Sequence, residues 1–352
     1  MTEHEQILGV ETEYGLMGTD TAGEALDPEL LSKQLIDLAK KRLEHLPDRS
    51  SHGLFLTSGM RLYRDGPNGA LEAATPECLD PFQVAAYVRA GDFLVRRLAT
   101  ERERSVFGIA RVVALRNAVS YPAGQPGVLE LSRDRRAAST RGQHECYSIP
   151  GELRIRDLAL PLLSHLASRP LLTGEGGFDP NGALPVFTRS ARLELFEALS
   201  GHESTHHRSL WHSKDEPLTD GMTKRVHIIC GGTSITDAGL ILKVGATGLV
   251  LAAACQGVKI SSMWRASKPL DALRTWLRDP SVPVRCGHGR RASAGDVQRA
   301  YLDCVAARTD VLPSYADRIL PLWRDMLQQV CEDPAALQNR LDWPLKEALY
   351  RA

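Results

Sequence analysis

An α+β fold, with helices covering a mostly antiparallel sheet, is predicted by the pattern of strands and helices in this sequence. Strand-like segments and long helical patterns are intermingled along the chain. The early strand candidates carry polar side chains at every second position, so one face of each strand differs chemically from the other. Neither a Walker motif nor a Rossmann glycine fingerprint is present. With 352 residues, 43% of them hydrophobic, the chain is long enough to bury a sizeable core.

Two helices are marked by an acidic cap followed by proline, at Asp27-Pro28 and at Asp80-Pro81. Apolar residues at helical spacing follow both signals, and Pro47 is expected to end the first helix. Further helices are predicted over 238–255, 293–308, 315–331 and 333–350. Strands are predicted over 9–15, 61–65, 71–77, 111–115 and 225–230. Irregular structure is predicted over 117–143 and 174–181.

Composition excludes several classes of protein. Lysine and arginine balance aspartate and glutamate at 43 each, which argues against a nucleic-acid binder working through a general positive field. The seven cysteines contain no Cys-x-x-Cys pair and several lie in apolar runs, which is typical of thiols in a reducing cytosol. The apolar stretch 244–255 is short for a membrane span. We therefore expect a soluble cytoplasmic protein with no nucleic-acid or membrane partner.

Acidic side chains recur on the faces of the first strands. Glu11 and Glu13 point the same way along one strand, and a lone Glu72 lies in the apolar run of another. The strand between them presents Arg61, Tyr63 and Asp65 on one face. Gathered carboxylates repel one another unless cations neutralise them, and their hard oxygens suit Mg²⁺. A solvated strand face is the competing interpretation, and the metal-and-phosphate interpretation is favoured.

Three weaker patterns add candidates. Arg225 and His227 share a strand face, so they are candidates for the nucleotide and metal sites, although a lone strand histidine is often structural. Arg290 lies in a glycine-flanked double-arginine segment before a helix, a pattern that can bind anions or form a solvated loop. The histidines at 202, 206, 207 and 212 lack convincing zinc spacing and are expected in a solvated loop.

The motifs together resemble those of the Pup ligase and depupylase family. They are GVETEYG at 9–15, GMRLYRD at 59–65, LEAATPEC at 71–78, HECY at 144–147, KDEP at 214–217, RVHIICG at 225–231, LKVG at 242–245, GRRASA at 289–294 and LDW at 341–343. The resemblance implies the carboxylate–amine ligase fold related to glutamine synthetase, with ATP and Mg²⁺ on the concave face of a curved sheet.

The resemblance also implies roles for single residues. Glu11, Tyr63 and Glu72 would hold magnesium, and Arg61 and Thr75 would contact ATP. Asp65 would be the catalytic acid, base or nucleophile.

Two departures from the family pattern affect what the resemblance implies. Gly232 and Ser234 stand where the family has an acid and an amide. Residues 1–352 are expected to form a single catalytic domain without the family's smaller C-terminal domain, with a partner as a possible source of that domain.

The leading hypothesis for function is an ATP- and Mg²⁺-dependent ligase that phosphorylates a glutamate-type carboxylate and forms an amide or isopeptide bond. Its partners would be a small protein modifier, a peptide or a small-molecule carboxylate, together with an amine acceptor. A depupylase- or deamidase-like hydrolase using nucleotide as cofactor is the alternative, since Asp65 serves either reaction. A non-catalytic scaffold relative is the third.

Overall fold

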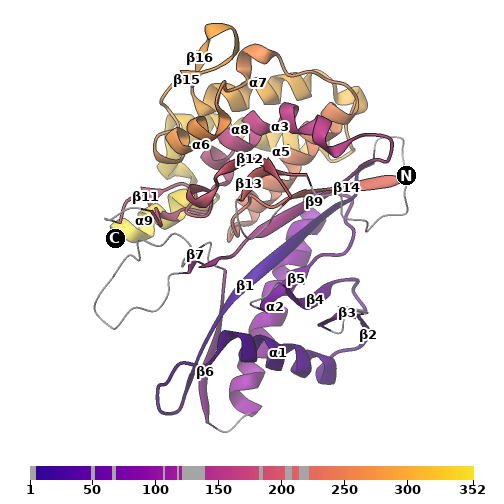
Figure 1. Ribbon diagram of the computed structural model, residues 1–352, viewed down its shortest axis with the longest axis vertical. Helices are drawn as coiled ribbons and strands as arrows, with labels where there is room; N and C mark the ends of the chain where they lie inside the picture. Colours follow the sequence, from indigo (N-terminus) through magenta and orange to yellow (C-terminus); the bar gives the residue numbers. More distant parts are fainter. Residues whose placement is uncertain are drawn as a thin grey trace.

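The computed structural model describes residues 5–48, 52–65, 69–105, 108–116, 119–120, 139–181, 185–202, 208–213 and 222–352. Its central feature is an extended sheet with helices packed along it (Figure 1). The KDEP segment at 214–217, His206, His207 and most of the loop predicted over 117–143 lie outside the described residues. The other predicted elements can be compared with the structure.

The central sheet is antiparallel, as the sequence predicts. Its strands follow the order β14-β9-β1-β5-β4-β3-β2, and β6 pairs with the second half of β1. These strands are β1 (Leu8–Asp20), β2 (His45–Pro47), β3 (Gly53–Leu56), β4 (Arg61–Asp65), β5 (Ala70–Ala74), β6 (Ile109–Leu115), β9 (Gln143–Pro150) and β14 (Thr223–Ile228). Four two-stranded pairs accompany it: β7 (Val119–Ser120) with β8 (Ser139–Thr140), β10 (Gly177–Phe178) with β11 (Phe187–Thr188), β12 (Ala198–Gly201) with β13 (Ser209–His212), and β15 (Val284–Arg285) with β16 (Arg291–Ala292).

Two hydrophobic cores lie along the sheet. The smaller core joins α1 and α2 to the second half of β1, while the larger joins β9 and β14 to the later helices (Figure 1). The α-helices are α1 (Pro28–Arg42), α2 (Pro81–Ser105), α3 (Ala159–Ser168), α4 (Pro170–Thr173), α5 (Asp237–Cys255), α6 (Pro269–Arg278), α7 (Ala294–Ala306), α8 (Ala316–Glu332) and α9 (Asp342–Arg351). Because β1 contributes residues to both cores, one strand connects the two halves.

The helix starts agree with the sequence signals. The carboxylate of Asp27 accepts the backbone N–H of Glu29, and that of Asp80 accepts those of Phe82 and Gln83. The segment 333–350 is mainly helical, as predicted, but in two pieces. Asp333 caps a short 3₁₀ turn over Pro334–Leu337, and α9 begins separately at Asp342.

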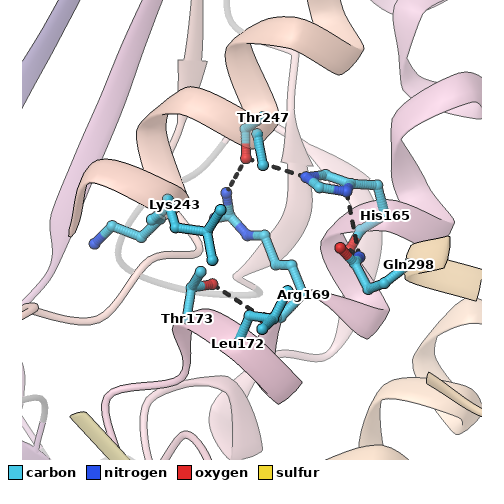
Figure 2. A pocket seen from close by; sticks show the side chains of 9 residues that line it. His165, Arg169, Leu172, Thr173, Lys243, Thr247 and Gln298 are labelled. Atoms are coloured by element: carbon cyan, nitrogen blue, oxygen red, sulfur yellow. Dashed lines mark hydrogen bonds between the residues drawn. The ribbon is translucent and has the colours of Figure 1, made fainter. Parts of the chain in front are cut away.

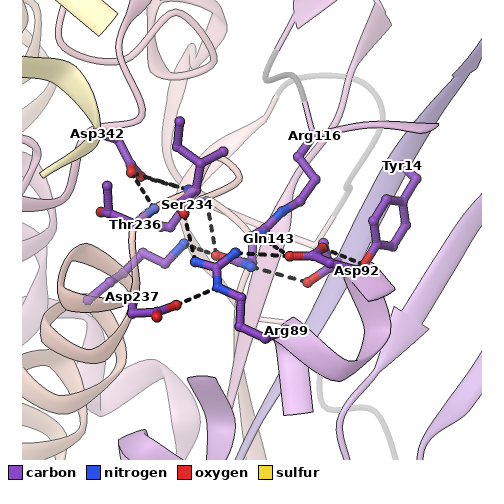
Figure 3. Close-up of polar contacts among 12 residues, drawn as sticks. Tyr14, Arg89, Asp92, Arg116, Gln143, Ser234, Thr236, Asp237 and Asp342 are labelled. Atoms are coloured by element: carbon purple, nitrogen blue, oxygen red, sulfur yellow. Dashed lines mark hydrogen bonds and ion pairs between the residues drawn. The ribbon is translucent and has the colours of Figure 1, made fainter. Parts of the chain in front are cut away.

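Helix α5 is the central helix of the larger core. It is long and apolar enough to cross a bilayer by length and composition, yet 72% of its apolar window is buried within the protein. Its N-terminal end is held by polar contacts that reach α2 and α9 (Figure 3). The carboxylate of Asp342 accepts the backbone N–H groups of Ile235 and Thr236, and Arg89 pairs with both Asp92 and Asp237. These contacts fix α5 and the preceding turn against the sheet.

A buried polar cluster lies behind the sheet, between β9, α3 and α5 (Figure 2). Arg169 makes a two-pronged ion pair with the carboxylate of Glu145 at 2.7 and 2.8 Å, and donates to Thr247 Oγ1 at 2.8 Å. The Nζ of Lys243 donates to Gln143 Oε1 at 2.6 Å and to the Gly232 carbonyl at 2.9 Å. Since Gln143 and Glu145 alternate with His144 along β9, these contacts hold the strand whose other face carries His144.

Candidate active site

The strand register places the predicted acidic residues on one face of the sheet. Glu13 lies opposite Glu72 across β1 and β5, and Glu72 lies opposite Tyr63 across β5 and β4. On the other side of β1, Glu11 lies opposite His144 of β9. The intervening residues, such as Val10 and Leu71, are buried in the hydrophobic cores. The alternation that the sequence predicted therefore separates a polar face from a core face.

Glu11 is surrounded by cationic and imidazole groups. Its Oε1 accepts from Arg225 at 3.1 Å, while its Oε2 lies 3.1 Å from His227 Nε2 and 3.5 Å from His144 Nδ1. Burial opposes the charged form of Glu11, but hydrogen bonds from His144 and His227 and their charges outweigh it and hold the pKa well below its usual range. Glu11 is therefore an ionised carboxylate at neutral pH.

Glu72 is in the opposite situation. It is 1% exposed, and burial together with the charges of Glu11, Glu13 and Asp65 raises its pKa well above the usual value. Its Oε1 is buried and has no hydrogen-bond partner among the described residues. An acidic oxygen without a partner among other acids is the environment that a divalent cation neutralises. Burial likewise raises the pKa of the Tyr63 phenol, which stays neutral beside Glu72.

Among the residues that the structure describes, two groups of side chains have donor atoms close enough to share a metal ion. One consists of Glu11, His144 and His227, and the other of Glu13, Glu72 and His144, with all donor atoms of a group within 4.8 Å of one another. The carboxylates and the unpartnered oxygen of Glu72 fit a hard cation such as Mg²⁺. The residues predicted as metal ligands are thus brought together, with Tyr63 beside Glu72.

The predicted nucleotide and catalytic residues lie around this face. Arg61 stacks over the Tyr63 ring at 4.0 Å and pairs with Asp48 at 2.7 Å. Thr75 Oγ1 accepts the backbone N–H of Val10 at 3.1 Å, so its hydroxyl helps hold the end of β5 against β1. Asp65 is exposed at the end of β4, close enough to raise the pKa values of Tyr63 and Glu72 through its charge.

Arg225 and Arg290 have different positions. Arg225 reaches Glu11 on the acidic face. Arg290 instead stacks on Trp264 at 3.7 Å, in the β15–β16 hairpin beside α7 (Figure 1). The turn contains His288 at φ 54° and Gly289 at φ 74°, left-handed backbone conformations that a tight turn uses. The structure does not bring Arg290 together with the other predicted residues.

Three further side chains belong to this region and were not among the predicted site residues. His144 faces Glu11 with Nδ1, and its Nε2 lies 3.4 Å from Arg192. Arg208 is near Glu13, and burial together with the charge of Arg192 lowers its pKa to about 10. His144 was detectable, because it alternates with buried residues of β9. The two arginines come from irregular segments that have no period, so the sequence offered no signal for them.

His212 corrects another expectation. It is 3% exposed in β13, and its ring lies 5.5 Å from that of His227, rather than in a solvated loop. His212 ends a short strand that packs against both α3 and β14, and this packing buries it.

Residues 6–352 match the family model described as Pup-ligase protein. A Pup deamidase/depupylase of Mycolicibacterium smegmatis is 32% identical over 300 residues, which cover 83% of this chain and 56% of that protein. A Pup–protein ligase of Paenarthrobacter aurescens is 30% identical over 355 residues, covering 98% of this chain and 73% of the relative. The chain therefore spans about half the length of the first relative and about three quarters of the second.

Solved structures agree in architecture. The complex between Pup and its ligase PafA superposes with a TM-score of 0.79 at 25% identity, over 98% of this chain and 68% of that chain. The glutamate–cysteine ligase of Francisella tularensis in complex with AMP has a TM-score of 0.54 at 11% identity, over 99% of this chain and 85% of that one, and shows a likeness of fold alone. The predicted carboxylate–amine ligase fold is thereby confirmed.

Proposed function

Because this chain belongs to the Pup-ligase family, we propose that it is an ATP- and Mg²⁺-dependent ligase that activates a glutamate-type side-chain carboxylate and joins it to an amine. The observation that carries this proposal is the sheet face on which Glu72, raised in pKa and unpartnered at Oε1, stands beside the ionised Glu11. The acids on this face repel one another. A face of this kind is suited to a nucleotide that arrives with divalent cations.

A carboxylate is a poor acyl donor because its leaving group would be an oxide. Transfer of the γ-phosphoryl group of ATP to the substrate carboxylate gives an acyl phosphate, from which phosphate can leave. Bound Mg²⁺ would offset the negative charge of the phosphoryl group during transfer. Glu11, Glu13 and Glu72 would hold the cation, and the guanidinium groups of Arg225, Arg192 and Arg208, which lie around the same acids, would contact phosphate oxygens.

Asp65 is proposed as the proton acceptor. An attacking amine must lose a proton as the amide bond forms, and the proton needs an acceptor near the metal-bearing face. Asp65 lies at the exposed end of β4, where an acceptor amine can approach from solvent, and its charge reaches Tyr63 and Glu72. The side chain therefore combines access with proximity.

The carboxylate donor is proposed to be a small protein modifier. The solved complex that superposes best among those reported above contains Pup bound to its ligase. A peptide or a small-molecule carboxylate is the simpler substrate of the same class. The finer assignment rests on this resemblance, and the amine acceptor is left open.

Hydrolysis is the second candidate reaction, and one observation favours it. The Mycolicibacterium smegmatis relative, 32% identical, is a Pup deamidase/depupylase rather than a ligase. In that reaction water would be consumed, the C–N bond of the amide would break with the help of Asp65, and ammonia or a lysine amine would leave, with nucleotide bound but not consumed. Both reactions use the same face, so the position of Asp65 is compatible with each.

The ligase reaction consumes ATP, whereas the hydrolase reaction does not. Purified protein is incubated with ATP, Mg²⁺, a Pup-type modifier ending in glutamate or glutamine, and a lysine-containing acceptor. Phosphate release equal to conjugate formed, observed by mass spectrometry, supports the ligase. Loss of ammonia from the glutamine form without net ATP consumption supports the hydrolase.

Substitutions test whether the acidic sheet face carries out the reaction. Asp65→Asn is expected to abolish product while ATP still binds, and Arg225→Gln to weaken ATP binding. Arg285→Gln, which removes an exposed guanidinium from β15, is the matched control. Product formation by Asp65→Asn at the wild-type rate contradicts the proposed role of Asp65. The absence of ATP binding by the wild-type protein contradicts the proposed function.

A further inference from the structure

Position 232 has no side chain in this protein, where the family pattern has an acid. The space beside it is filled by Glu175, a residue between α4 and β10 that is 1% exposed. A Cβ at position 232 would lie 2.3 Å from Glu175 Cδ and 2.4 Å from its Oε2, much closer than nonbonded atoms approach. A side chain at 232 and the present position of Glu175 therefore exclude each other.

Glu175 puts a carboxylate oxygen where an acid at 232 would put one. The carboxylate oxygens of aspartate are two bonds from its Cβ, and Glu175 Oε2 lies 2.4 Å from the Cβ position of residue 232, about the reach of those two bonds. The backbone there is held without a side chain, since the Gly232 carbonyl accepts from Lys243 Nζ at 2.9 Å and Gly232 pairs with Gly142. The same turn can thus receive its acidic group from either position.

Glu175 also holds the turn that carries Arg192. Its Oε1 accepts from Ser190 Oγ at 2.9 Å and from the backbone N–H of Arg192 at 3.0 Å. The buried guanidinium of Arg192 donates to Thr140 Oγ1 at 2.8 Å, and its Nη2 lies 3.4 Å from His144 Nε2. Arg192 is therefore held at its backbone by Glu175 and at its guanidinium by groups beside the acidic sheet face.

We infer that Glu175 supplies the carboxylate that the family pattern has at position 232, and that it is a positioning residue that directs Arg192 toward the acidic sheet face. The inference rests on the proposed function, in which Arg192 contacts phosphate oxygens. It adds to that function a buried acid that touches neither the nucleotide nor the cation and still sets the affinity for nucleotide.

The hydrogen bonds of Glu175 indicate that its oxygen matters as well as its bulk. Both of the bonds described above end on Oε1, and both donors belong to the turn of Arg192. A buried backbone N–H that loses its acceptor costs free energy, because water does not replace the acceptor there. Glutamine keeps an acceptor oxygen at this place, whereas methionine fills similar space without one. These two replacements separate positioning by a hydrogen bond from the filling of space.

The first test compares Glu175→Gln with Glu175→Met in the full-length protein. Calorimetry measures the affinity for Mg²⁺-ATP, and mass spectrometry follows hydrogen exchange over residues 189–195. We expect Glu175→Met to weaken ATP binding by about fivefold or more, and Glu175→Gln by about twofold or less, as the loss of one hydrogen bond predicts. Exchange in the segment should accelerate in Glu175→Met and stay as slow as in the wild type in Glu175→Gln.

The second test moves the acid. Gly232→Asp alone places two side chains in one space and should lower the Tm measured without nucleotide. Adding Glu175→Ala removes the overlap and leaves one carboxylate, so the double variant should regain Tm and bind Mg²⁺-ATP within about threefold of the wild type.

Glu194→Ala is the matched control. It removes another buried acid of the same segment, one that accepts from Thr188 Oγ1 at 2.8 Å and makes no described contact with Arg192. Glu194→Ala should lower the Tm without weakening ATP binding, and Gly232→Asp should not rescue it.

Two results would overturn the inference: wild-type ATP affinity and hydrogen exchange in Glu175→Met, or a double variant that is no more stable than Gly232→Asp. If Gly232→Asp does not fold, the comparison of Glu175→Gln with Glu175→Met decides alone. Absence of ATP binding by the wild-type protein contradicts the proposed function. Tm and hydrogen exchange, which need no nucleotide, then decide whether Glu175 holds the turn of Arg192.

Discussion

Replacing Glu72 by glutamine keeps the shape of the side chain and removes a carboxylate that is 1% exposed among other acids. Burial first, and the neighbouring acids second, raise the pKa of Glu72 well above the usual value of 4.5. A buried acid with a raised folded-state pKa binds protons more tightly in the folded chain. The metal-free protein should therefore lose stability as the pH rises from about 4.5 to the raised pKa. Glu72→Gln should lack this loss.

The size of the chain sets the expected shifts in Tm. Each pKa unit corresponds to about 1.4 kcal/mol of unfolding free energy. A chain of 352 residues unfolds with an entropy on the order of 0.7 kcal/mol/K. Each pKa unit then corresponds to about 2 °C in Tm. Glu72→Gln should raise the metal-free Tm at neutral pH by this amount for every unit by which the Glu72 pKa is raised. Mg²⁺ at about 100 times its Kd stabilises the wild type by about 2.7 kcal/mol, or about 4 °C.

Scanning calorimetry in chelator and in Mg²⁺ measures both effects. The wild type should gain about 4 °C with Mg²⁺, and Glu72→Gln should start higher and gain little. Glu77→Gln removes an exposed acid five residues away and should behave as the wild type does. The reasoning is refuted if Glu72→Gln lowers the metal-free Tm, or if it keeps the full response to Mg²⁺.

Contacts behind the sheet lead to three further expectations. Arg169→Met leaves the buried Glu145 carboxylate without its ion-pair partner. Urea titrations should show the free energy of unfolding lowered by about 3–5 kcal/mol, and by less when both partners are replaced by methionine. Gly232→Ala would bring the new Cβ within 2.3 Å of Glu175 Cδ. Calorimetry should find the variant destabilised by about 1–3 kcal/mol, and adding Glu175→Ala should restore part of the lost stability. Asp342→Ala removes the acceptor of two backbone N–H groups before α5, so hydrogen exchange there should accelerate and stability should fall by about 1–2 kcal/mol. An Asp342→Ala protein with unchanged exchange contradicts the capping role, and an unchanged urea midpoint for Arg169→Met contradicts the importance of the ion pair.

Local rules were sufficient where an element depends on its own residues. The Asp27-Pro28 and Asp80-Pro81 signals predicted two helix starts, because a capping carboxylate satisfies N–H groups within one turn. The side-chain period of a strand predicted that Glu11 and Glu13 share a face, because that period is a property of extended backbone. Both conclusions hold whatever other parts of the chain pack against the segment.

Local rules failed where packing decided the outcome. Arg290 has the glycines and neighbouring helix of an anion-binding loop, yet it stacks on Trp264 in a hairpin. His212 was expected in a solvated loop, yet it is 3% exposed at the end of β13. The helical pattern over 333–350 is divided into a 3₁₀ turn and α9, and the carboxylate of Asp342, at the start of α9, accepts backbone N–H groups ahead of α5.

The sequence by itself determined the fold class, the family and the face on which Glu11, Glu13, Tyr63 and Glu72 lie, because these follow from period, capping and the order of motifs. Tertiary structure alone decided which strands are neighbours. It set Glu13 against Glu72, surrounded Glu11 with two imidazoles, and brought arginines from irregular segments to their side. The pKa values follow from that arrangement, since burial and the distances between charges are properties of the folded chain.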